Sequence, residues 1–262
     1  MRIIVCVKQV PGTTRVEMDP KTGVLKRDGT ASKMNPYDLY ALETALRLKE
    51  QLGGRIVVIS MGPPQAEAVL REAYRMGADE GYLICDRKFA GSDVLATSFT
   101  LAQGIRKSGG FDLVICGKQT TDGDTAQVGP ELAEFLGIPH VAWVKAITEA
   151  TAGKIVVEQD LADSCQVVEM DYPCLITVEK GIVQPRLPSY RLKLATADRP
   201  VQTIGFNDLE IQDQLKYGLD GSPTQVERIF PPEVNHAQVI WNGEPHELVD
   251  KFFKTLQAAK FV

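Results

Sequence analysis

Two polar segments follow apolar runs, and both carry residue types that bind phosphate. One runs from Cys6 to Gly12 and the other from Gly117 to Pro130. If the two apolar runs are neighbouring strands of a parallel sheet, these segments converge on one crevice beyond the carboxyl ends of the strands. Such sheets bind their ligands at that place. The pattern favours binding of a phosphate-containing ligand over side-chain catalysis.

The longer segment has the makings of a phosphate cradle. Gly117 and Gly123 let the backbone approach a ligand closely, and Asp124 or Thr125 can cap the helix expected next. The free N–H groups at the start of that helix would face a diphosphate and favour its negative charge. Lys118 could add a cation. These features together predict a diphosphate site.

Other features of the same segment count against phosphate. Asp122 and Asp124 are carboxylates, which would repel it unless they bind ribose hydroxyls or backbone amides. The dinucleotide fingerprint GxGxxG and the P-loop GxxxxGK[ST] are both absent. A polar strand-to-helix loop built from turn residues explains the composition equally well. The residue types alone leave both interpretations open.

Two shorter segments are expected at the same edge of the sheet. Residues 35–38 (NPYD) are explained as a helix start, with Asn35 as the N-cap and Pro36 at the first helical position. Residues 60–64 (SMGPP) are explained as a turn into a helix. No Ser/His/Asp or Cys/His arrangement is suggested by spacing, and three histidines leave little general-base chemistry. Any redox chemistry would therefore belong to a cofactor.

The elements that must position these segments alternate in type through the first half of the chain. Amphipathic stretches separate five short apolar runs, which are rich in Val and Ile as strands covered on both faces are. The runs are residues 2–8, 55–60, 81–85, 111–116 and 141–147. They predict an α/β fold: a right-handed, doubly wound, mainly parallel sheet with strand order 3-2-1-4-5.

The pattern changes near residue 148. Residues 154–161 and 166–179 are expected to form additional antiparallel strands, and a Pro-rich loop follows at 184–191. Beyond about residue 196 periodicity is weak until an amphipathic helix at about 245–259. We expect a ligand-binding domain at 1–195 and a C-terminal arm and helix at 196–262.

The arm is expected to pack on a partner subunit, and a disordered tail is the alternative. Packing is favoured by its large apolar residues: Ile204, Phe206, Ile229, Phe230 and Trp241.

Composition excludes several classes of protein. A net charge of −5 makes nucleic acid a poor partner. No apolar run approaches the roughly 20 residues of a membrane helix, and the first seven residues indicate a strand, not a signal peptide. Five cysteines without a CxxC, and three histidines far from any cysteine pair, indicate no zinc site. We expect a reduced, cytoplasmic protein that binds no metal.

The motifs in these segments resemble the beta subunit of electron-transfer flavoproteins. The resemblance is carried by VCVKQV, NPYD, MGPP, RMGAD, GKQTTDGDTAQVGPELAEFLG and TVEKGIVQPRLPSY. It covers residues 1 to about 195, with a weaker match in the tail. The GKQ motif followed by an acidic loop and QVG is specific, whereas each shorter motif alone is not.

The resemblance implies a nucleotide in the crevice, which ordinary members fill with a structural AMP. Their loop resembles GKQAIDDDxNQTGQ, whereas TDGDTAQVGP here is similar to bifurcating members, whose beta subunit binds a second FAD. Gly123 in place of a larger acidic residue would leave room for this longer ligand. The residues implied to touch the nucleotide are Cys6, Asn35, Pro36, Tyr37, Asp38, Met61, Gly117, Lys118, Gln119, Thr120, Thr121, Asp122, Gly123, Asp124, Thr125, Ala126, Gln127 and Val128.

For the bifurcating type, the resemblance implies that NADH gives hydride to the flavin bound here. One electron would pass through the FAD of the electron-transfer flavoprotein alpha subunit to a flavin-dependent dehydrogenase of the acyl-CoA or hydroxyacid type. The other would pass to ferredoxin, and some complexes run in reverse.

The loop from Pro185 to Tyr190, with the cations Arg186, Arg191 and Lys193, would face the dehydrogenase by the same resemblance. A solvated surface explains these cations as well. The Lys-rich run that follows this loop in many non-bifurcating members is absent. Two alternatives stay open: a conventional AMP-binding subunit, and an ATP-binding signalling module on the same sheet topology.

Overall fold

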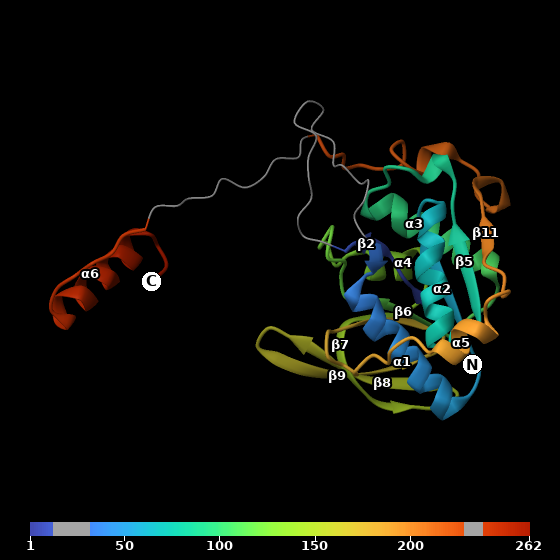
Figure 1. The fold of residues 1–262 in the computed structure, drawn as a ribbon, viewed down its shortest axis with the longest axis horizontal. Helices are drawn as coiled ribbons and strands as arrows, with labels where there is room; N and C mark the ends of the chain where they lie inside the picture. Colours follow the sequence, from blue (N-terminus) through green and yellow to red (C-terminus); the bar gives the residue numbers. More distant parts are fainter. Residues whose placement is uncertain (13–31, 228–237) are drawn as a thin grey trace. The chain divides into compact units, whose positions relative to one another are not determined.

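The computed structural model describes residues 1–12, 32–227 and 238–262 (Figure 1). The chain divides into two compact units, Met1–Glu227 and Arg228–Val262. The first unit therefore extends beyond the boundary expected at 195/196.

Most strands of the described residues form one sheet, in the order β11-β5-β4-β1-β6-β10-β7-β8-β9 (Figure 1). Neighbouring strands pair in parallel, except that β8 pairs antiparallel with both β7 and β9. The bounds are β1 Arg2–Cys6, β4 Arg55–Met61, β5 Glu80–Ile84, β6 Leu113–Gly117, β7 His140–Ala150, β8 Lys154–Leu161, β9 Ser164–Asp171, β10 Cys174–Val178 and β11 Gln202–Ile204.

The expected strand order is confirmed for the first four strands and needs a correction at the fifth. β7 is not the neighbour of β6, because β10 lies between them and pairs in parallel with both. The run 166–179 was expected as one strand, but it is divided at Pro173, which has no N–H to donate to a ladder. All five residues of β10 are buried, as suits a central parallel strand.

Helices cover both faces of the sheet, and the sheet separates two apolar cores. Ile3 and Val5 of β1 face a core shared with α1 and α2, whereas Ile4 faces a core shared with α3 and α4. This alternation is the period of two that a strand covered on both faces requires. The helices are α1 Pro36–Leu52, α2 Glu67–Met76, α3 Val94–Ser108, α4 Val128–Leu136, α5 Tyr190–Ala195 and α6 Pro245–Ala258.

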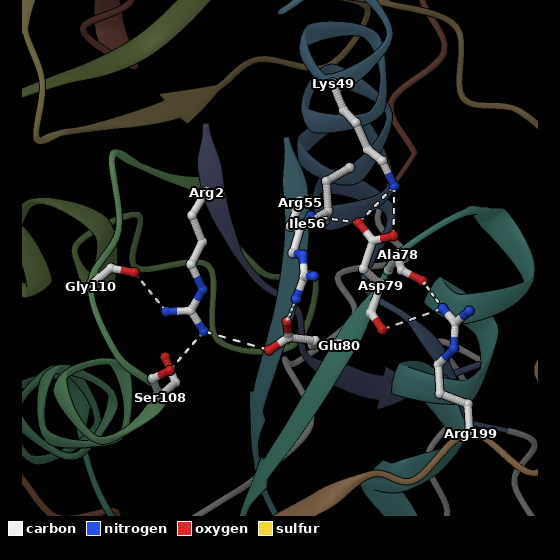
Figure 2. Close-up of polar contacts among 10 residues, drawn as sticks. All are labelled: Arg2, Lys49, Arg55, Ile56, Ala78, Asp79, Glu80, Ser108, Gly110 and Arg199. Atoms are coloured by element: carbon white, nitrogen blue, oxygen red, sulfur yellow. Dashed lines mark hydrogen bonds and ion pairs between the residues drawn. The ribbon is translucent and has the colours of Figure 1, made fainter. Parts of the chain in front are cut away.

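Ion pairs and backbone contacts occupy the amino ends of β1, β4 and β5 (Figure 2). Arg2 donates to the carbonyls of Ser108 and Gly110, and its guanidinium lies 3.7 Å from Glu80. Arg199 donates to the carbonyl of Ala78 at 2.7 Å, which ties the segment beyond residue 195 to the sheet. These charged groups serve the fold, and the residues singled out by sequence lie at the opposite edge.

The C-terminal residues correct part of the expectation for the arm. Ile204 and Phe206 are buried within the first unit, so they do not serve a partner surface. Ile229 and Phe230 lie outside the described residues. The final helix is confirmed as α6, and it exposes Val249 and other apolar side chains. Within the described residues, no helix combines the length and the apolar character that are needed to cross a membrane.

Candidate functional site

The two polar segments meet at the carboxyl ends of β1 and β6. These strands are paired neighbours, with Cys6 opposite Cys116. Beyond their ends, the Lys8 Nζ lies 2.7 Å from Oδ2 of Asp122 in the loop 117–128. A short antiparallel ladder of β2 (Gln9–Pro11) and β3 (Ser32–Met34) directs the Lys8 segment toward the start of α1. The predicted convergence is confirmed.

Asn35 is the residue that fastens the long loop to the body of the protein. Its side chain is fully buried, and its Nδ2 donates to the carbonyl of Gln119 at 2.9 Å. Its Oδ1 accepts from the N–H of Thr121 at 3.2 Å. The predicted helix start is confirmed, with Asn35 at the N-cap and Pro36 at the first helical position, but the Asn35 side chain makes no capping hydrogen bond because these long-range bonds occupy it. Asn35 thus positions the loop.

Asp38 joins both segments from the first turn of α1. Its buried carboxylate accepts from the N–H of Lys8 at 2.8 Å, from Asn35 Nδ2 at 3.0 Å and from the N–H of Gly117. Burial raises the pKa of Asp38 from 3.8 to about 7, although these hydrogen bonds and the Lys8 charge act against the rise. Asp38 is therefore a structural hub with little surface for a ligand.

Gly117 is needed for close packing at this hub. A Cβ at this position would lie 2.5 Å from Oδ1 of Asp38 and 2.7 Å from the carbonyl carbon of Tyr37. Its small size therefore lets the end of β6 touch the start of α1. The sequence predicted a glycine for close approach to a ligand, whereas the structure uses it for approach to the protein itself.

The two carboxylates that counted against phosphate both have partners within the chain. Asp122 pairs with Lys8, and Asp124 accepts from the side-chain amide of Gln119. Burial would raise the pKa of Asp122, but the Lys8 hydrogen bond and charge outweigh it and hold the pKa below its usual range. The charge of Asp122 is therefore compensated by Lys8, whereas exposed Asp124 has only a neutral amide as its partner.

Helix α4 begins later than expected. Gln127 occupies the N-cap position without a side-chain cap, so the predicted caps Asp124 and Thr125 are wrong. The reason is local: Asp124 and Ala126 have φ values of 54° and 56°, and this left-handed backbone ends the turn before a helix can start.

The first turn of α4 leaves hydrogen-bond donors open. Within the described residues, the N–H groups of Val128 and Gly129 have no hydrogen-bond acceptor. The positive end of the helix dipole is therefore available to an anion.

Gly129, Trp143 and Glu179 are parts of this edge that the sequence reasoning missed. A Cβ at Gly129 would lie 2.3 Å from Cγ2 of Thr177, so this glycine lets α4 pack on β10. Lys118 Nζ pairs with Glu179 at 2.6 Å and lies 4.9 Å from the centre of the Trp143 ring. The segment from Gly117 to Pro130 contained Gly129 and the motif TVEKGIVQPRLPSY contained Glu179, but neither residue was given a role, and no sequence signal marked Trp143.

The remaining predicted residues divide by their contacts. Cys6 is partly buried beside Cys116. A hydrogen bond between the two thiols, together with burial, raises the pKa of the Cys116 thiol. Met61 ends β4 at the same edge but makes no hydrogen bond to the loop among the described residues. The partly or fully exposed residues of the edge are Pro36, Tyr37, Thr120, Thr121, Gly123, Thr125, Ala126, Gln127 and Val128.

Comparison with known proteins adds an independent observation. The family model described as "Electron transfer flavoprotein domain" matches residues 22–209. The chain is 44% identical over 259 residues to "Electron transfer flavoprotein subunit beta" of Thermoanaerobacterium thermosaccharolyticum, with 98% of each chain covered. It is 45% identical over 259 residues to "Caffeyl-CoA reductase-Etf complex subunit CarD" of Acetobacterium woodii, again with 98% of each covered. "Protein FixA" of Azorhizobium caulinodans is 44% identical over 238 residues, with 88% of this chain and 85% of the relative covered.

Proposed function

Because this chain belongs to the electron-transfer flavoprotein family as a beta subunit, we propose that its crevice holds the diphosphate of an FAD. The observation that supports this most is the pair of bonds from Asn35 to the loop 117–128, at Gln119 and Thr121. They hold the loop across the carboxyl ends of β1 and β6, beside the open N–H groups of α4.

The residues present fit a diphosphate. Val128 and Gly129 offer backbone N–H groups at a helix start, where negative charge is favoured. Lys8 lies at the same edge, and its exposed ammonium could exchange Asp122 for a phosphate oxygen. Around Gly123, an added Cβ would meet only Thr120 Oγ1, at 3.5 Å, among the described residues. Gly123 is therefore exposed and does not itself obstruct a ligand longer than AMP.

FAD, when bound, would supply hydride exchange with NAD(H) and transfer of single electrons. The chain's own residues bind and orient it. Asn35 and Asp38 fix the loop, Lys8 and Lys118 balance negative charge, and the first turn of α4 supplies N–H donors. This division agrees with a site that contains no catalytic side chain.

The proposed complex contains an electron-transfer flavoprotein alpha subunit, ferredoxin and a flavin-dependent dehydrogenase. The loop sequence TDGDTAQVGP supports the bifurcating type, and the relative named as part of a "Caffeyl-CoA reductase-Etf complex" supports a partner that acts on a CoA thioester. All five cysteines are free, which fits the proposed location in a reducing cytoplasm.

The test is anaerobic addition of NADH to the purified alpha–beta heterodimer. The proposal expects the flavin absorbance to bleach without any dehydrogenase present. A flavin spectrum that NADH leaves unchanged would support the alternative, a conventional subunit with a structural AMP. One observation favours that alternative: the Asn35 bond to Gln119 and the start of α4 lie where a phosphate common to AMP and FAD would bind. Membership of the electron-transfer flavoprotein family argues against the third alternative, an ATP-binding signalling module.

A further inference from the structure

Trp143 in β7 has a backbone conformation that its surroundings must enforce. Its φ is 58°, in the left-handed region that bulky residues rarely adopt, and its side chain is 38% exposed. Strain of this kind is found preferentially at ligand sites. The N–H of Trp143 donates to Oγ1 of Thr177 in β10 at 2.9 Å, and the β7–β10 ladder shifts register here. Such irregularities re-aim a side chain out of the regular strand pattern.

The indole of Trp143 contacts Lys118, which belongs to the loop 117–128. Lys118 Nζ lies over its ring, 4.9 Å from the centre, and the same ammonium pairs with Glu179 at the end of β10. The N–H of Lys118 also donates to the carbonyl of Val178 at 3.0 Å. Lys118 is thus held from both sides, and it keeps the ring beside the start of the loop.

Trp143 also lies close to the expected diphosphate position. Thr177 is the link, because its Cγ2 occupies the space that a Cβ on Gly129 would fill, and its Oγ1 accepts from Trp143. Gly129 carries one of the open N–H groups of α4. A single threonine therefore separates the anion-binding helix start from the backbone of Trp143.

The order of the strands shows which part of a dinucleotide would reach this position. Along the carboxyl edge the order is β4-β1-β6-β10-β7, and adjacent strands are about 4.8 Å apart. With the adenosine at β1 and β4, where the resemblance implies contacts with Cys6 and Met61, the diphosphate would lie at β6 and α4. The second ring system lies beyond the diphosphate, and continuing along the edge brings it to β10 and β7. Trp143 is the exposed aromatic residue of β7 at that point.

We infer that Trp143 is the aromatic contact for the flavin ring, and that it favours FAD over AMP in this crevice. The inference rests on the proposed function, since it requires FAD in the beta subunit. Offset stacking on an indole stabilises a planar ring, and AMP has no ring on this side of its phosphate. Lys118 positions the indole and Thr177 holds its backbone. Trp143 is therefore a specificity-determining residue.

The experiment measures FAD and AMP affinities of the full chain in complex with its alpha subunit. Trp143→Ala should weaken FAD binding about tenfold and leave AMP binding unchanged, whereas Trp143→Phe should retain most of the FAD affinity. Val167→Ala is the control, because Val167 is an exposed apolar residue of the antiparallel strand β9, and it should change neither affinity. FAD, but not AMP, should quench the fluorescence that is lost in Trp143→Phe.

The outcomes separate this inference from the function on which it rests. If the wild-type complex binds FAD and Trp143→Ala binds it equally well, the inference fails while the proposed function stands. An equal loss of FAD and AMP affinity would also overturn it, since that result indicates general damage to the crevice. If the wild-type beta subunit binds AMP but no FAD, the proposed function fails, and the inference fails with it.

Discussion

Lys8 and Asp122 are 114 positions apart in the chain, yet Nζ of one lies 2.7 Å from Oδ2 of the other at the carboxyl edge of the sheet. Their side chains are 45% and 33% exposed, so the pair itself contributes at most about 1 kcal/mol to stability. Its importance is that it holds an exposed cation at the carboxyl edge of the sheet, beside the loop 117–128.

Replacing Lys8 by glutamine should lower nucleotide affinity. The loss of one cation near a diphosphate costs about 1 kcal/mol, or about fivefold in affinity, and the difference from wild type should shrink at high salt. Calorimetry on the heterodimer measures it. Lys154→Gln is the matched control, because Lys154 pairs with Glu169 in the antiparallel strands. Equal affinities of Lys8→Gln and wild type at low salt would contradict the assignment.

Replacing Asn35 by alanine should loosen the loop 117–128. The change leaves the carbonyl of Gln119 and the N–H of Thr121 without their buried partner, which should cost about 2–3 kcal/mol of unfolding free energy. Denaturant unfolding measures the cost, and hydrogen exchange at Thr121 reports the loop. Asn207→Ala is the control, since Asn207 is exposed. Unchanged exchange at Thr121 would show that Asn35 does not fasten the loop.

Asp38 should make the protein less stable as pH rises from about 4 to about 7. Its pKa is raised from 3.8 to about 7 because burial disfavours the ionised form. The native state therefore keeps a proton that the unfolded state loses, and stability present below pH 3.8 is lost as pH rises through about 7. The full effect is at most about 4 kcal/mol, from about three pKa units.

The check on Asp38 is the difference in unfolding free energy between wild type and Asp38→Asn, measured from pH 4 to 8. A non-titrating amide removes this one contribution and leaves the other groups in place. Parallel curves across the whole range would contradict the raised pKa, because they would mean that Asp38 binds its proton equally in the native and the unfolded state.

Replacing Arg186 should lower the unfolding free energy more than replacing Arg47, although both residues pair with Glu43. Glu43 in α1 is buried, and Arg186 donates to its carboxylate from Nε at 2.8 Å, from Nη2 at 3.0 Å and from the backbone N–H at 3.1 Å. These bonds outweigh burial and hold the pKa of Glu43 below its usual range. Arg47 makes one bond and its side chain is 58% exposed. Arg186 thus fixes the loop that exposes Leu187 and Tyr190.

The comparison of Arg186→Gln with Arg47→Gln tests this difference at equal change of charge. Arg186→Gln should destabilise the protein by about 2–3 kcal/mol and speed hydrogen exchange in residues 184–191, because it leaves a buried carboxylate short of its main partner. Arg47→Gln should cost less than about 1 kcal/mol. Similar costs for the two variants would show that the loop is not held through Glu43.

The sequence predicted the parallel core of the fold because strands buried on both faces leave a plain signal, an uninterrupted run of Val and Ile. It predicted residues 174–178 as part of a strand, but not as the separate parallel strand β10, because residues 166–179 have no helix before them and Pro173 marks a break that can also be a bend within a meander. The position of β10 (CLITV) between β6 and β7 depends on which neighbouring strands bury its side chains best. Tertiary contacts decide this, and the local sequence pattern does not encode them.

The candidate site shows the same limit. Asn35 is at the N-cap position that its local pattern predicts, but its side chain bonds to Gln119 and Thr121, which the local pattern does not reveal. Glycine at 117 was correctly associated with close approach, but the approaching group is Asp38. Trp143 gave no signal, because its importance arises from a left-handed backbone and a neighbour 25 positions away in the chain, Lys118.

The most direct measurement is the nucleotide content of the purified alpha–beta heterodimer, released by denaturation and quantified as FAD and AMP. A dinucleotide gripped between the Lys8 segment and the loop 117–128 predicts two FAD molecules per heterodimer and no stoichiometric AMP. One FAD together with one AMP per heterodimer would contradict it.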